Sequence, residues 1–78
     1  MNPKKEIDLI GVVSPVCLLK CKSVLAKLGT GDVLEVLVQD PEVVEELIKI
    51  IERSQDQVLN SKREGDHYRI LLKKGEKE

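Results

Sequence analysis

Two Pro-containing dipeptides constrain this chain more than any other feature, because each marks the start of a helix. Ser14-Pro15 and Asp40-Pro41 both join a side chain that can cap backbone N–H groups to a residue shaped for the first helical turn. Apolar residues at helical spacing follow each dipeptide. The sequence therefore predicts helices over about residues 15–28 and 41–53.

Both predicted helices are amphipathic. In the first helix, one side collects the apolar residues Cys17, Leu18, Cys21, Val24, Leu25 and Leu28. The side chains that point away from it are those of Lys20, Lys22, Ser23 and Lys27. In the second helix, the inward-facing residues are Val43, Val44, Leu47, Ile48 and Ile51. Such helices pack their apolar side on a sheet.

Four segments have the apolar pattern of strands: residues 6–10, 32–38, 57–63 and 67–73. Gly65 lies in the short connection between the last two and favours an antiparallel hairpin. The expected fold is of the α/β (α+β) class, a two-layer βαβαββ sandwich with two helices on one face of a four-stranded mixed sheet. We expect a single domain over residues 1–78, with an ordered core from about 6 to 74.

Composition excludes many classes of function. Thirteen Lys and Arg against 14 Asp and Glu give a net charge of -1, and aromatic residues make up 1%, so nucleic acid is not an expected partner. One His and two Cys fall short of the four ligands of a zinc site, so we expect no metal and no cofactor. Two cysteines make no disulfide framework, and there is no leader or apolar anchor. The sequence predicts a cytoplasmic monomer that does not enter a membrane.

Several segments of the chain are similar to motifs that occur together in one known family. They are Asp8-Leu9-Ile10-Gly11, Ser14-Pro15-Val16-Cys17, Gly31-Asp32-Val33-Leu34-Glu35-Val36 and Gln39-Asp40-Pro41. With these motifs the chain resembles the TusA/SirA family of small sulfur-transfer proteins over nearly its whole length. The resemblance implies a βαβαββ fold and a sulfurtransferase-type carrier that holds sulfur as a persulfide on a motif cysteine. It also implies protein partners, a cysteine desulfurase as donor and an acceptor, for example towards tRNA thiolation.

The motif that carries sulfur in this family, Cys-Pro-x-Pro, is Ser-Pro-Val-Cys in this chain. In an alignment without gaps, Ser14 occupies the position of the family's cysteine and Cys17 that of its second proline. A carrier holds sulfur in an S–S bond that a thiolate forms by attack and releases by exchange. A hydroxyl cannot do this, and we interpret Ser14 as a helix cap.

The sequence leaves three readings of this site open. In the first, Cys17 is a displaced persulfide carrier near the positive end of the helix dipole, with Cys21 as a resolving partner. The alternative to this hypothesis is that both thiols are inert core residues. In the second, the chain is not an enzyme and binds a partner protein, as a regulatory module, through Gly11, Ser14 and Pro15. In the third, Ser14 is an engineered replacement of a cysteine.

The remaining candidates have simpler interpretations. His67 begins the last predicted strand beside a turn, where we expect an exposed polar side chain. A candidate basic patch for an acidic protein or an RNA consists of Lys20, Lys22, Lys27 and Arg69.

Overall fold

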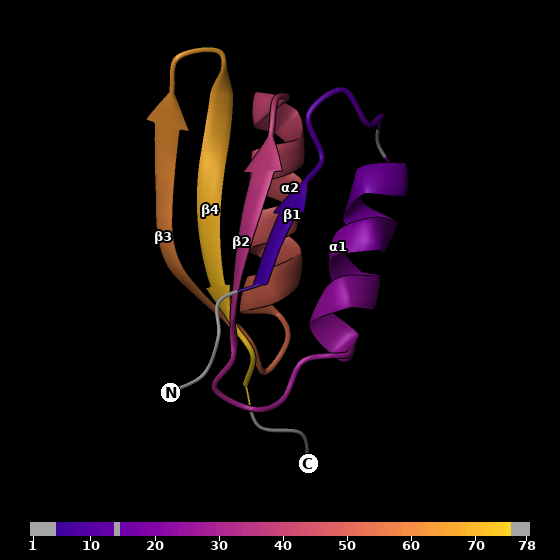
Figure 1. Cartoon of the computed structure of the whole chain (residues 1–78), viewed down its shortest axis with the longest axis vertical. Helices are drawn as coiled ribbons and strands as arrows, with labels where there is room; N and C mark the ends of the chain where they lie inside the picture. Colours follow the sequence, from indigo (N-terminus) through magenta and orange to yellow (C-terminus); the bar gives the residue numbers. More distant parts are fainter. Residues whose placement is uncertain (1–4, 14, 76–78) are drawn as a thin grey trace.

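The chain folds into two layers, a sheet and a pair of helices that cover one of its faces (Figure 1). The computed structural model describes residues 5–13 and 15–75. Its elements in chain order are β1 (Lys5–Asp8), α1 (Val16–Ala26), β2 (Val33–Val38), α2 (Pro41–Glu52), β3 (Gln57–Glu64) and β4 (His67–Lys73). The predicted βαβαββ order is confirmed.

The sheet is mixed, with the strand order β1-β2-β4-β3. β1 and β2 pair in parallel, whereas β4 pairs antiparallel with both β2 and β3. A parallel pair needs a crossover connection, and α1 supplies it. Gly65 and Asp66 join β3 to β4, and Gly65 has a φ of 66°, which a two-residue hairpin turn requires and a glycine adopts without strain.

The core forms where alternate side chains of the two internal strands meet both helices. In β2 and β4 the buried residues that face the helices are Leu34, Val36, Val38, Ile70 and Leu72. From α1 the core receives Cys17, Leu18, Cys21 and Leu25, and from α2 it receives Val43, Val44, Leu47 and Ile51. The predicted inward faces of both helices are therefore confirmed, with Val24, Leu28 and Ile48 partly buried against the core.

The ends of the first elements differ from the predicted ones. β1 ends at Asp8 because its carboxylate accepts a hydrogen bond from the Ile10 N–H at 3.0 Å, which turns the chain away from the sheet. α1 begins at Val16, one residue after Pro15, and ends at Ala26. Beyond its end, the N–H groups of residues 27 and 28 bond to carbonyls three residues back, which tightens the last turn.

The two predicted helix caps have different outcomes. Asp40 caps α2 as predicted, since its carboxylate accepts a hydrogen bond from the Glu42 N–H at 2.9 Å. Ser14, the predicted cap of α1, lies outside the described residues, so its capping role stays a prediction.

The face of the sheet away from the helices carries a network of charges. Arg69 donates hydrogen bonds to Glu35 and, at 2.9 Å, to Glu64, and this second bond lowers the pKa of Glu64. His67 lies 3.5 Å from Glu64 and 3.2 Å from Asp66. Its side chain is half-buried, so the expectation of an exposed His67 is wrong, because the strand places it among these carboxylates.

The side chains of β4 that face the helices should contribute most to stability. Ile70 is fully buried, so Ile70→Ala should lower the free energy of unfolding by about 2–5 kcal/mol through lost burial and a residual cavity. Leu59 in β3 is 50% exposed, and Leu59→Ala should change it by no more than about 0.5 kcal/mol. Urea unfolding followed by circular dichroism measures both. Equal losses for the two variants would show that the core is not where the fold places it.

Candidate functional site

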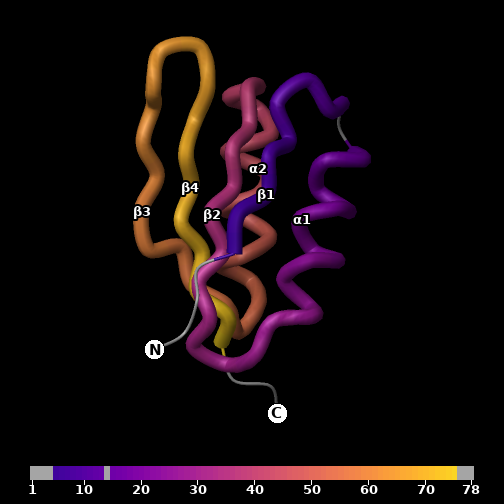
Figure 2. The backbone as a smooth tube through the Cα atoms, viewed as in Figure 1, coloured from indigo at the N-terminus to yellow at the C-terminus, as the bar shows by residue number. Residues whose placement is uncertain are grey.

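Four chain segments converge at one end of the molecule. Because β1 and β2 are parallel, their carboxyl ends lie side by side, and the chain leaves each of them into a helix (Figure 2). The starts of α1 and α2 therefore lie at the same end of the sheet. In open α/β sheets, this end of parallel strands is where ligands usually bind.

A cavity of about 440 Å³ opens at this end, and we call it the helix-start pocket. Its walls come from the β1–α1 loop, the first turn of α1, the end of β2 and the connection into α2. The lining residues are Leu9, Gly11, Val12, Val13, Cys17, Val38, Gln39, Asp40, Pro41 and Val43. Most of these side chains are apolar, and among the described lining residues Asp40 alone carries a charge.

Cys17 lies in the wall of this pocket, in the first turn of α1. It faces the interior and is only 2% exposed. Its backbone N–H donates to the carbonyl of Val13 at 3.1 Å, which ties the start of α1 to the β1–α1 loop. Cys17 is therefore a buried residue that borders a cavity, and the loop over it determines access to its thiol.

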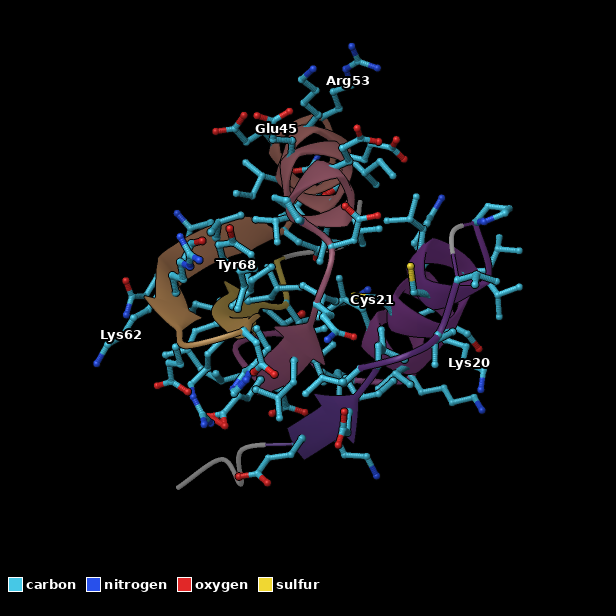
Figure 3. The ribbon with its side chains drawn as sticks, turned by 90° about the horizontal axis from the view of Figure 1, so that it is seen from above. Lys20, Cys21, Glu45, Arg53, Lys62 and Tyr68 are labelled. Atoms are coloured by element: carbon cyan, nitrogen blue, oxygen red, sulfur yellow. The ribbon has the colours of Figure 1, made fainter. Side chains whose placement is uncertain are left out.

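Cys21 lies one helical turn further on and is fully buried between α1 and the sheet (Figure 3). Burial, together with the nearby Cys17, raises the pKa of Cys21 to about 12. A thiol with this pKa is almost entirely protonated at neutral pH and is a poor nucleophile. Both cysteines are free thiols. These observations favour an inert core role for Cys21 over that of a resolving partner.

Two of the other predicted site residues, Gly11 and Pro15, are described by the structure. Gly11 lines the pocket and has a φ of 83°, a backbone conformation that residues with side chains rarely adopt. Pro15 is exposed just before α1. Ser14 lies outside the described residues.

Sequence reasoning missed the far wall of the pocket, which residues 38–41 and Val43 provide. From the sequence, Asp40 and Pro41 are predicted only to start a helix. The signal that would have found them is the predicted parallel pairing, since it brings the end of residues 32–38 beside the segment before Cys17.

Four large apolar side chains are exposed beside the pocket. They belong to the β1–α1 loop and to the outer side of α1, and we call them the apolar rim: Ile10, Val13, Val16 and Leu19. Val13 is 70% exposed and Leu19 is 63% exposed.

The predicted basic patch is only partly assembled. Lys20, Lys22 and Lys27 are exposed on or just after α1, as predicted. Arg69, however, lies on the face of the sheet away from the helices, where it binds Glu35 and Glu64. Its inclusion in the patch is therefore wrong, because strand alternation directs it to the opposite layer.

Within residues 5–13 and 15–75, no group of three or more His, Cys, Asp or Glu side chains could hold a metal ion. In the same part of the chain, no helix is long and apolar enough to cross a membrane.

Comparison with known proteins assigns the chain to a family. Residues 5–74 match the family described as Sulfurtransferase TusA. The chain belongs to the TusA family. The Sulfur carrier protein TusA of Allochromatium vinosum is 30% identical over 70 residues, which cover 90% of this chain and 92% of that protein. The family assignment makes this chain a homologue of sulfur carriers.

A solved structure supports the same assignment. The SirA-like protein from Desulfitobacterium hafniense superimposes with a TM-score of 0.72 at 30% identity, covering 91% of this chain and 97% of that one. This TusA-family chain therefore keeps the fold of its relatives.

Thiol labelling should distinguish the two cysteines. In the folded protein at neutral pH, iodoacetamide should modify Cys17 at least about ten times faster than Cys21, because Cys17 borders the pocket and Cys21 has a raised pKa. The matched variants are Cys21→Ala, which leaves Cys17, and Cys17→Ala, which leaves Cys21. Mass spectrometry measures both rates. Identical rates that follow global unfolding would show that the pocket gives no access to Cys17.

Proposed function

We propose that this TusA-family chain relays sulfur on Cys17, accepting it from the persulfide of a donor protein and passing it to an acceptor protein. The observation that carries this proposal is the position of Cys17 in the wall of the helix-start pocket. In the described part of the chain, no other cysteine lines this pocket. Family membership supports the same activity.

The transfer conserves atoms and electrons. The Cys17 thiolate attacks the terminal sulfur of the donor persulfide, a new S–S bond forms on Cys17, and the donor's S–S bond breaks. The donor cysteine leaves as a thiolate and takes up the proton that Cys17 lost. Handover to the acceptor repeats these steps with the roles exchanged.

The pocket gives the added sulfur a place to lie. Its volume of about 440 Å³ exceeds what one extra sulfur atom needs and leaves room for the side chain that presents it. Since Cys17 is only 2% exposed, we expect the β1–α1 loop to move aside during transfer. Gly11 is the residue of that loop whose backbone has the widest freedom.

A second candidate function is a partner-binding module without sulfur carriage. The low exposure of Cys17 favours it, as does the serine at the position of the family cysteine. The surface of Gly11, Ser14 and Pro15, extended by the apolar rim, would then bind the partner without any transfer of sulfur.

The proposed donor and acceptor of the sulfur come from the resemblance to the TusA/SirA family. A cysteine desulfurase is the proposed donor, and an acceptor in tRNA thiolation is the proposed destination. Free thiols are typical of proteins in a reducing compartment, so we propose that the protein is cytoplasmic. We also propose that the chain forms a single domain.

Sulfur loading tests the proposal directly. After incubation with a cysteine desulfurase and cysteine, intact mass should rise by about 32 Da, and peptide mapping should place the added sulfur on Cys17. Cys17→Ala should abolish the gain, and Cys21→Ala should retain it.

The control variant Ser14→Cys returns a thiol to the family position and shows whether the donor recognises this chain. If Ser14→Cys, Cys17→Ala gains sulfur while the parent protein gains none, carriage on Cys17 is refuted. The partner-binding module would then be the function of this chain.

A further inference from the structure

We infer that the outer face of α1 is a docking surface for an acidic amphipathic helix of a partner protein. This inference deepens the proposed function by giving the chemistry of the partner, and it rests on that function only for the partner's place in a sulfur relay. Docking itself needs no sulfur on Cys17.

The first observation is that α1 is apolar on both sides. At helical spacing, its outer side presents Val16, Leu19, Ser23 and Ala26, all of which are exposed. Val16 is 42% exposed and Leu19 is 63% exposed. A helix that only covers a sheet normally turns polar side chains to water. Within residues 5–13 and 15–75, no element covers the side chains of Val16 and Leu19.

The second helix of the same sheet provides an internal comparison. The exposed residues of α2 are Pro41, Glu42, Glu45, Glu46, Lys49 and Glu52. In Figure 3, Glu45 and Arg53 point away from the sheet at the outer side of α2. Two helices that both begin at the helix-start pocket therefore differ in their outer faces, and only that of α1 exposes large apolar side chains.

The apolar surface continues from α1 to that pocket. In the β1–α1 loop, Val13 is exposed, lines the pocket and accepts a hydrogen bond from the Cys17 N–H in the first turn of α1, and Ile10 is exposed as well. A helix that packs along α1 would therefore place one of its ends over the entrance to Cys17.

The charge of this surface indicates the chemistry of its partner. Lys20, Lys22 and Lys27 flank the outer side, and residues 16–27 contain no acidic residue. Among the described residues, none of these lysines takes part in an ion pair, and Figure 3 shows Lys20 pointing away from the sheet. Since the whole chain has a net charge of -1, this positive surface is local. It complements an acidic partner.

Other occupants fit this surface less well. Two copies that met through α1 would place three lysines opposite three, and the acidic outer side of α2 has no exposed large apolar residue to offer a second copy. Nucleic acid would use the lysines but leave the apolar side chains without a contact. An acidic helix with apolar residues at i, i+3, i+4 and i+7 satisfies both features.

A designed peptide tests this surface. The probe is a fluorescent helical peptide with leucines at i, i+3, i+4 and i+7 and glutamates at its other positions, and its matched control has lysines in place of the glutamates. Fluorescence anisotropy at low salt should show binding of the acidic peptide and at least about tenfold weaker binding of the basic one. Added salt should weaken the binding. Equal affinity for both peptides, or no binding of either, would overturn the inference.

Matched variants locate the surface. Leu19→Glu should weaken binding at least about tenfold, while Leu59→Glu, at an exposed leucine on β3, should leave it unchanged. The triple variant Lys20→Glu, Lys22→Glu, Lys27→Glu should prefer the basic peptide, while Lys62→Glu should not (Figure 3). Wild-type binding by Leu19→Glu, or equal losses in both leucine variants, would refute the surface.

Two further measurements separate this inference from the proposed function and from self-association. Cys17→Ala should bind the peptide like the parent protein, so failure of sulfur loading leaves the docking surface intact. If loading succeeds and the peptide does not bind, the docking inference alone fails. Analytical ultracentrifugation should show no self-association of the protein. A dimer that dissociates in the Leu19→Glu variant would instead show that a second copy binds this face.

Discussion

Parallel strands run toward the same end of a sheet, so the pairing of β1 with β2 brings their carboxyl ends to one edge. The helix that follows each strand must then start at that edge. This single constraint places the β1–α1 loop, Cys17 and Asp40 around one cavity, although they are far apart in the chain. Without the parallel pair, the residues before α2 would form no wall opposite Cys17.

Burial gives the two cysteines of α1 different chemistry. Cys21 belongs wholly to the core, and the cost of a charge there keeps its thiol protonated. Cys17 contributes to the same core but also borders the pocket. Its backbone N–H donates a hydrogen bond to the Val13 carbonyl and so ties the β1–α1 loop to the start of α1. The proposed sulfur relay on Cys17 therefore requires local movement of that loop, because its thiol is not permanently exposed.

Much of the fold could be predicted from periodicity, because alternation and helical spacing directly reflect which side chains leave water. The inward residues of both helices and the Asp40 cap follow from this logic. The end of β1 did not, since it depends on a hydrogen bond from Ile10 to the Asp8 side chain. The site was only half predictable. Sequence pointed to Cys17, but its pocket depends on a tertiary contact, and the side of the sheet that Arg69 occupies depends on strand register.

The central claim is that sulfur enters the chain at Cys17 through the helix-start pocket. Backbone amide NMR spectra recorded before and after sulfur transfer from polysulfide test it most directly. If sulfur enters at Cys17, the largest shift changes should fall on residues 11–13, on Cys17 and on Gln39, Asp40 and Val43, with the β3–β4 hairpin unchanged. Changes centred on that hairpin, or none in the pocket after sulfur is bound, would contradict it.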